Sequence, residues 1–223
     1  AGILIRTNGQ LRAFEGGASS SELVNLVYSI MLTRSPVDTV QVRAIPDALR
    51  ESITRAGGKG LRLRRKGNTE YTEDGVTLLF DRQNWFTPQE IEIEVQEDFV
   101  DQGRHDLNIK HTVREGNTAD SGGAYNDLTL PSVTVDVIDN DSANVVIIQS
   151  DSNTNVIEES TTDSYQVVLS RQPTGEVVIS ATETSNQLSV SPTTLTFTTA
   201  NWAAPQTVTV TAGIDENTEG LHH

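Results

Sequence analysis

Residues 137–148 read VIDNDSANVVII, so that Asp139, Asn140 and Asp141 stand together between two apolar runs. Asp and Asn side chains form turns readily, because they hydrogen-bond their own backbone. Their carboxylate and amide oxygens are also the ligands that Ca²⁺ prefers, in sets of about six to eight oxygens at about 2.3–2.6 Å. The segment is therefore either a plain turn or part of a cation site, and the elements around it decide between the two.

The composition bounds the classes of function. The chain has 223 residues, a formal net charge of −15 and no cysteine. A chain this acidic is a poor general binder of nucleic acid or anionic membrane and favours cations as partners. The lack of cysteine excludes disulfides, cysteine-ligated zinc and cysteine nucleophiles. No apolar run is long enough to span a bilayer, and the opening AGILIRTNGQ has neither an initiator Met nor a signal-peptide pattern. We expect a piece of a longer polypeptide.

The residues that could perform catalysis are not arranged as known catalytic sites require. Glu97 and Asp98 are adjacent on one loop, unlike the separated carboxylates of glycosidases. The serines show no nucleophile-elbow pattern. His105 and His111 are about 20 Å apart along a strand, which is too far to share one metal, and we expect both to be half-exposed. The sequence therefore predicts a protein that is not an enzyme.

An internal repeat organises the chain. Residues 77–103 align without gaps with residues 194–220, and both tryptophans of the chain, Trp85 and Trp202, fall at equivalent positions. An earlier block, YSIMLTRSPVDTVQVRA, matches YQVVLSRQPTGEVVISA in the same order. Because a repeat of this length is the signature of a repeated folded unit, each copy is expected to be one module.

The repeat sets the expected module boundaries. Module 1 is expected at 1–141, with an insertion at about 45–76 that has no counterpart in the other copy. Module 2 is expected at 142–223 and should lack its last two strands, since its sequence stops soon after the repeat ends. An unpaired sheet edge and an open core would follow.

The polar and apolar residues alternate with the period of two that half-buried antiparallel strands show, as in EIEIEV, SVTVDVI and TVTVTA. Turn residues separate these segments at about 8–12 residues, which is typical of a sandwich. Each Trp lies between two strands, where we expect it to cap the core, and the Pro that follows suits an unpaired strand start. Residues 46–58, PDALRESITRAGG, are the best candidate for a helix, with a Gly-Gly end.

The succession AFEGG, TLLF…NWFTPQEIEIEVQEDFVDQGRHD and LPSVTVDVIDNDSA resembles the Calx-β domain as it occurs in tandem in large bacterial surface and adhesin proteins. The resemblance covers nearly the whole chain and is most specific in the second half of each module. It implies all-β modules, each a seven-stranded, immunoglobulin-like antiparallel β-sandwich. It also implies Ca²⁺ bound by loops at one end, near the junction with the next module.

The resemblance implies that four segments supply the ligands of module 1: the end of the first strand, the loop before TLLF, the loop after EIEIEV and the end of the last strand. Carried onto this sequence, the metal ligands are Glu15, Glu70, Glu97, Asp98, Asp101, Asp139, Asn140 and Asp141. The chain departs from the family pattern at Glu70, Gln102 and Asn140, which lowers the expected charge of the site.

For module 2 the resemblance implies only a partial or empty site. The counterpart of Glu70 is missing, and the terminal Asp cluster would lie after the last residue. The acids that fit the pattern are Glu158, Glu159, Asp215, Glu216 and Glu219.

The stretch RAGGKGLRLRRKG is the most basic part of the chain. It could contact a polyanion, such as an acidic polysaccharide or a lipid headgroup, through Arg62, Arg64, Arg65 and Lys66. A simpler interpretation is a hairpin in which Leu61 and Leu63 face the core while the arginines between them face water.

Taken together, the sequence predicts a Ca²⁺-binding structural or adhesive segment of a large extracellular or cell-surface protein. Ca²⁺ would stiffen the joint between modules, and the partners would be neighbouring modules of the same polypeptide and an unidentified surface ligand such as a glycan. Nucleic acid and direct membrane insertion are not expected. Two alternatives stay open: a Ca²⁺-sensing regulatory module of a membrane protein, and a carbohydrate- or polyanion-binding module that uses the basic insertion at 50–66.

Overall fold

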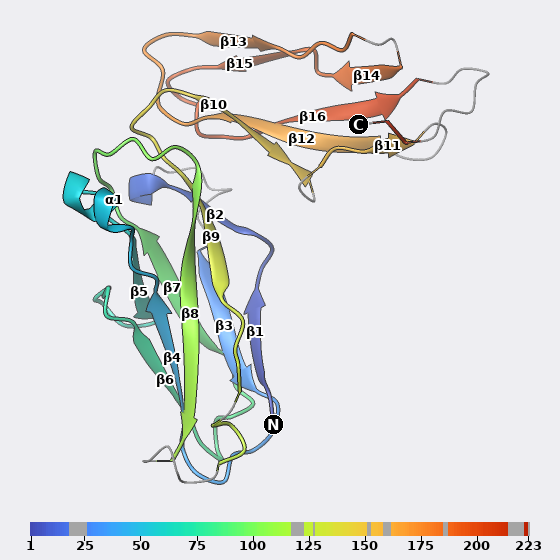
Figure 1. Cartoon of the computed structure of the whole chain (residues 1–223). Coiled ribbons are helices and arrows are strands. Elements are labelled where there is room, and N and C mark those ends of the chain that lie inside the picture. The colour runs from blue at the N-terminus through green and yellow to red at the C-terminus, as the bar shows by residue number, and fades with distance from the viewer. Residues whose placement is uncertain are drawn as a thin grey trace. The chain divides into compact units, whose positions relative to one another are not determined.

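The computed structural model describes residues 1–17, 26–116, 123–126, 128–150, 153–157, 162–184, 187–213 and 221–222. These residues form β-strands and, within the described ranges, a single short α-helix. They divide into two compact units, one ending at Asp139 and the other beginning at Asn140 (Figure 1). The predicted all-β class is confirmed. None of the helices in this part of the chain is long and apolar enough to cross a membrane.

The first unit contains a four-stranded sheet, in the order β1-β3-β7-β5, and a five-stranded sheet, in the order β2-β9-β8-β4-β6. The strand pairs are antiparallel except that β2 runs parallel to β9. The bounds are β1 Ile3–Thr7, β2 Leu11–Phe14, β3 Val27–Leu32, β4 Val40–Pro46, β5 Leu61–Arg65, β6 Val76–Phe80, β7 Gln89–Val95, β8 His105–Glu115 and β9 Val133–Ile138.

The core of the first unit lies between these sheets and follows from the alternation of side chains. In β7 every second residue is buried, including Ile91, Ile93 and Val95, while the glutamates between them are half-buried. The facing sheet contributes Leu78, Phe80, Ile109 and Val135 to the same cluster, and the neighbouring strand β3 contributes Tyr28. Period-two sequences therefore predicted the buried face correctly.

The number of strands differs from the seven that the resemblance implies, for two local reasons. The first strand is divided at Asn8-Gly9, where Gly9 has a φ of 78°, and its halves β1 and β2 join different sheets. The insertion adds β5, which pairs with β7 in the register Leu61↔Val95.

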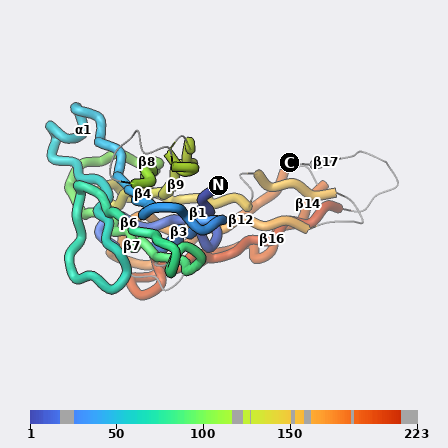
Figure 2. Tube along the Cα trace, turned by 90° about the horizontal axis from the view of Figure 1, so that it is seen from below, coloured from blue at the N-terminus to red at the C-terminus, as the bar shows by residue number. Residues whose placement is uncertain are grey.

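The insertion also forms the predicted helix, α1 (Glu51–Ala56), at the periphery of the first unit (Figures 1 and 2). It ends at Gly57, which is left-handed with a φ of 96° and donates its N–H to the last turn. Such an end favours glycine, because other residues are strained there. The predicted Gly-Gly end is confirmed.

The second unit contains one four-stranded sheet, in the order β10-β12-β16-β14, and the separate pairs β13–β15 and β11–β17. Its core is more open than that of the first unit. Val145 and Ile147 are 50% and 55% exposed, although their pairing with β12 matches that of the half-buried Ile3 and Ile5 with β3. The bounds are β10 Val145–Gln149, β11 Val156–Ile157, β12 Thr162–Leu169, β13 Val177–Ser180, β14 Leu188–Ser191, β15 Thr194–Phe197, β16 Gln206–Ala212 and β17 Leu221–His222.

The repeated Asn-Trp…Pro-Gln sequence forms the same hydrogen bonds in both units. The Trp85 carbonyl accepts from the Leu32 amide at 3.0 Å, and the Trp202 carbonyl accepts from Leu169 at 3.2 Å. Each Trp ring packs against its own core, as the sequence predicts.

The Asn and Gln of this motif have a role that composition does not reveal. Asn84 and Gln89 both donate to the Leu79 carbonyl, at 3.2 and 2.8 Å. Asn201 and Gln206 donate in the same way to Thr196, which explains why both amides recur in the repeat.

One buried histidine departs from the expectation of half-exposed strand residues. His111 is 8% exposed, and its Nδ1 lies 2.9 Å from the Pro131 carbonyl. A carbonyl only accepts, so Nδ1 donates and Nε2 accepts from the Tyr28 hydroxyl at 3.0 Å. Burial lowers the pKa of His111, and the bond to Pro131 only partly offsets this.

The first unit should therefore lose stability as the pH falls below the unfolded-state histidine pKa of about 6.5, because the unfolded chain binds the proton first. A single group limits the slope to about 1.4 kcal/mol per pH unit. Urea unfolding between pH 7 and 5 measures this slope. His111→Gln should reduce it; an equal slope in this variant and in the parent chain would contradict the assignment.

Candidate cation site

Glu15 is placed by the end of β2. The strand stops at Phe14, and residues Glu15–Gly17 form a single turn, η1, in which Gly16 and Gly17 have φ values of 65° and 67°. This turn holds the Glu15 side chain inside the unit, with only 1% of the residue exposed. A buried carboxylate is costly unless charge or hydrogen bonds compensate it.

Asp98 is placed by the loop that follows β7 and is 2% exposed. Its Oδ2 accepts from the backbone N–H of Lys59 at 2.6 Å, and its Oδ1 accepts from that of Val100 at 2.8 Å. The amide of Gln102 also donates to Oδ2, at 3.3 Å. These bonds fix the carboxylate and partly compensate its burial, while each oxygen keeps capacity for a further interaction.

Asp98, Glu15 and Asp141 form the central cluster of the candidate site. One carboxylate oxygen from each lies within 4.8 Å of the other two. Asp141 follows the end of β9 by three residues and is half-buried. Ca²⁺–oxygen bonds of about 2.3–2.6 Å place two ligands of one ion up to about 5 Å apart, so the spacing fits a shared cation. Without one, three carboxylates this close would repel each other.

Glu97 lies against the backbone of η1. A Cβ atom on Gly16 would come within 1.8 Å of Oε2 and 3.0 Å of Cβ of Glu97. The absence of a side chain at Gly16 therefore lets this carboxylate lie beside the turn that carries Glu15. Glu97 is exposed, so it borders the cluster from the solvent side.

Gly16→Ala should consequently weaken cation binding as well as stability. The left-handed backbone costs a non-glycine residue about 1–2 kcal/mol, and the new methyl group would also displace Glu97. Gly17→Ala is a matched control, since its φ is almost the same but nothing lies within 4 Å of its Cβ position. Calorimetric Ca²⁺ titration of both variants should show weaker binding only for Gly16→Ala; equal effects would remove Glu97 from the site.

Asp139 has a structural role that the sequence did not reveal. It is 4% exposed, and its Oδ2 accepts from the backbone N–H groups of Gln102 and Gly103, the latter at 2.7 Å. It thus holds the 98–103 loop in place and is not part of the three-carboxylate cluster. Asn140 is half-buried and Asp101 is exposed, and neither belongs to that cluster.

The structure does not include Glu70 in the three-carboxylate cluster, so its role as a ligand stays a prediction. Thr72 forms an isolated antiparallel β-bridge with Leu63, so the same register places Glu70 near Arg65. Arg65 in turn pairs with Ile91 of β7. From there the loop at Glu97 is about 20 Å further along the strand, at ~3.3 Å per residue. Within that connection it is Glu73 that reaches the loop after β7, accepting a hydrogen bond from the Gln96 amide at 2.8 Å.

The predicted acids of the second module, Glu158, Glu159, Asp215, Glu216 and Glu219, lie outside the described residues.

The basic stretch forms a ladder of ion pairs. Arg62, Arg64 and Lys66 pair with Glu94, Glu92 and Glu90, the acids that face them from β7. Leu61 and Leu63 are buried at 3% and 0% exposure, which confirms the simpler interpretation. Exposed ion pairs contribute only about 0–1 kcal/mol each to stability, but they engage the basic side chains that would have to bind a polyanion. Only the exposed Arg65 has no ion pair within the described ranges, so a polyanion site at these four residues is not supported.

A buried ion triad supports the site and was missed at the sequence level. Asp136 of β9, 3% exposed, accepts from Arg12 of β2 at 2.5 Å and from Arg104 at 2.8 Å. The triad joins β2, which ends beside Glu15, to the segment that leaves the 98–103 loop. The register of the parallel pair β2–β9 places Arg12 opposite Asp136. A pattern within one segment of the sequence does not predict this pairing.

Comparisons with known proteins give a limited result. No protein-family model matches the chain, and no curated protein matches it either. The fold is similar to CBD12 from CALX1.2, at 16% identity and a TM-score of 0.41, covering 92% of this chain and 73% of that one. It is similar to the calcium binding domain CBD12 of CALX1.1, at 13% identity and a TM-score of 0.34, with the same two coverages.

A further similar structure is the C-terminal domain of the Streptococcus agalactiae AgI/II polypeptide BspA, at 8% identity and a TM-score of 0.29, covering 94% of this chain and 90% of that one. These identities and scores are too low to transfer a function, so the function has to be inferred from this chain's own residues.

Proposed function

We propose that Ca²⁺ binds to Glu15 and Asp98 of the first unit together with Asp141 of the segment that follows β9, with Glu97 at the edge of the site. The observation that carries the proposal is the convergence of three carboxylates, two of them almost fully buried, within 4.8 Å. Buried acids in such proximity are stabilised by a cation that they share.

The chemistry of the donors favours Ca²⁺ over other metals. The residues offer carboxylate oxygens and backbone carbonyls, with no cysteine anywhere in the chain. Hard cations prefer oxygen, and Ca²⁺ accepts irregular sets from separate segments, whereas Mg²⁺ demands near-ideal octahedral geometry and keeps much of its water. The donors here come from the end of β2, the loop after β7 and the segment after β9, which suits Ca²⁺.

The proposal for the whole chain is a non-enzymatic structural or adhesive segment made of two Calx-β-like modules, at 1–141 and 142–223, in a large extracellular or cell-surface protein. The repeated sequence, the acidic composition and the similarity of the Trp motifs in both units support this. Weak sites suffice at extracellular Ca²⁺ concentrations. In this proposal the cation stiffens the segment around Asp139–Asp141, which connects one module to the next.

An NMR titration of the ¹⁵N-labelled chain with Ca²⁺ tests the location of the site. Amide resonances of residues 15–17, 97–103 and 139–141 should shift with one common affinity, and Mg²⁺ at equal concentration should produce smaller shifts. Shifts confined to other segments, or none at millimolar Ca²⁺, would show that these acids do not bind the ion.

A further inference from the structure

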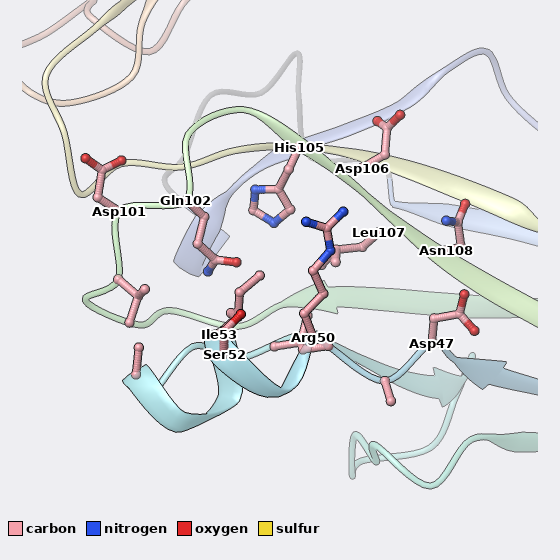
Figure 3. A pocket seen from close by; sticks show the side chains of 14 residues that line it. Asp47, Arg50, Ser52, Ile53, Asp101, Gln102, His105, Asp106, Leu107 and Asn108 are labelled. Carbon is pink, nitrogen blue, oxygen red and sulfur yellow. The ribbon is translucent and has the colours of Figure 1, made fainter.

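A cleft of about 450 Å³ lies beside α1 in the first unit (Figure 3). One wall is formed by the segment 47–50 and by α1, and the other by residues 100–102 and 105–108. Glu15, Asp98 and Asp141 do not line it, so it is separate from the cation cluster. Its volume falls within the range of about 300–1,000 Å³ that is usual for small-ligand sites.

The cleft is lined by both apolar and polar side chains. Leu49, Ile53 and Leu107 provide apolar surface on both walls. In Figure 3 the guanidinium of Arg50 and the ring of His105 come from opposite walls and face the same space. A small ring with apolar faces and polar edges matches this arrangement.

The rim offers both a donor and an acceptor. Arg50 is exposed, makes no side-chain cap to α1, and takes part in none of the ion pairs among the described residues, so its N–H groups can serve a ligand. The Nδ1 of His105 lies 2.8 Å from the Gly103 carbonyl. A carbonyl only accepts, so Nδ1 donates, and in the tautomer protonated at Nδ1 the other ring nitrogen, Nε2, accepts.

The rim of the cleft carries charges of both signs. Asp47, Asp101 and Asp106 line the cleft and outnumber Arg50, which disfavours an anion, although Asp47 is paired with Lys110 at 2.7 Å. Arg50 in turn disfavours a cation. A neutral ligand that carries hydroxyl groups can donate to the acids and to His105 and accept from Arg50.

We infer that this cleft is a binding site for a neutral pyranose ring. A pyranose presents C–H groups on its faces and hydroxyls around its edge, which suits the leucine and isoleucine surface and the mixed rim. The proposed site lies beside the helix of the insertion. The binding site considered from the sequence was the basic strand that follows this helix. None of the three carboxylates of the proposed cation site lines the cleft.

Saturation-transfer NMR with the methyl glycosides of glucose, mannose, galactose and glucuronic acid tests the inference, with and without Ca²⁺. Transfer to the ring protons of at least one neutral glycoside is expected in one of the two conditions, and the glucuronide should show less. Binding of the glucuronide alone, or of none of the neutral glycosides in either condition, would overturn the assignment. Ca²⁺ titration of the same sample tests the cation site separately.

Arg50→Ala, at the residue before α1, and Arg55→Ala, within α1, form a matched pair. Both arginines are exposed, but Arg55 pairs with Glu51 and does not line the cleft. Because a hydrogen bond from a charged donor contributes about 1.5–3 kcal/mol, Arg50→Ala should weaken glycoside binding about tenfold or more, and Arg55→Ala should not. Equal binding by both variants, or an equal loss in both, would overturn the assignment.

Discussion

In the Asp98→Asn variant, millimolar Ca²⁺ should leave the melting temperature of the first unit unchanged, whereas in the parent chain it should raise it by several degrees. A ligand that binds only the folded state at about 100 times its dissociation constant adds about 2.7 kcal/mol. For a unit of this size, each kcal/mol corresponds to roughly 2–4 °C. Asn keeps the shape of Asp98 and an oxygen that can accept from Val100, but its amide nitrogen replaces the oxygen that accepts from Lys59, so the change removes the charge and one hydrogen bond.

Asp101→Asn is the matched control for this prediction. It removes the same charge from the same loop, but Asp101 is exposed and lies outside the three-carboxylate cluster. A Trp202→Phe background leaves Trp85, which packs on the core of the first unit, as the only fluorescent Trp. If Asp98→Asn kept its full Ca²⁺-induced shift, or Asp101→Asn lost its own, the proposed ligands would be wrong.

Asp136→Asn should destabilise the first unit by about 3 kcal/mol, with or without Ca²⁺. Removing one partner of a buried ion pair leaves uncompensated charge and costs about 3–5 kcal/mol. The lower end applies because the Arg104 side chain is 38% exposed, although that of Arg12 is only 11% exposed. Urea unfolding measures the loss, with the exposed Asp106→Asn, at the paired position on β8, as control.

The pH dependence gives a second readout for Asp136. Burial alone would raise its pKa, but hydrogen bonds from Arg104 and Arg12 outweigh this and leave the pKa below its ordinary value. Since the folded pKa is depressed, the stabilisation is present above the unfolded value of about 3.9 and is lost as the pH falls below it. A loss under about 1 kcal/mol in Asp136→Asn, or an acid unfolding profile unchanged by it, would refute the role of the triad.

The strands and the core could be predicted from the sequence because their signal is local. A period-two segment such as EIEIEV fixes which residues face the core whatever its neighbours are. The repeat added the equivalence of Trp85 and Trp202, and the Gly-Gly sequence marked the end of α1. Each of these features is readable within about ten residues.

The candidate site was only partly predictable because its geometry depends on register. Asp139, Asn140 and Asp141 looked equivalent, yet Asp139 holds the 98–103 loop through two backbone N–H groups, while Asp141 joins the carboxylate cluster. The pairing of β5 with β7 separates Glu70 from that cluster. Such differences arise from contacts between distant segments, which no pattern in one segment encodes.

The insertion illustrates the same limit. Its arginines were the most conspicuous feature of the sequence, but the glutamates of β7 pair with them. The less conspicuous Lys59 contributes to the candidate site instead, since its backbone N–H holds Asp98 and its side chain donates to the Glu97 carbonyl at 2.8 Å. The insertion thus supports the loop that carries two of the proposed ligands.

The central claim is that Glu15, Asp98 and Asp141 share a Ca²⁺ ion. Isothermal titration calorimetry of the chelator-treated chain with Ca²⁺ measures this most directly. The proposal predicts a saturable heat in the micromolar to millimolar range that is abolished in Asp98→Asn and kept in Asp101→Asn. No heat at millimolar Ca²⁺, or a heat that survives in Asp98→Asn, would contradict it.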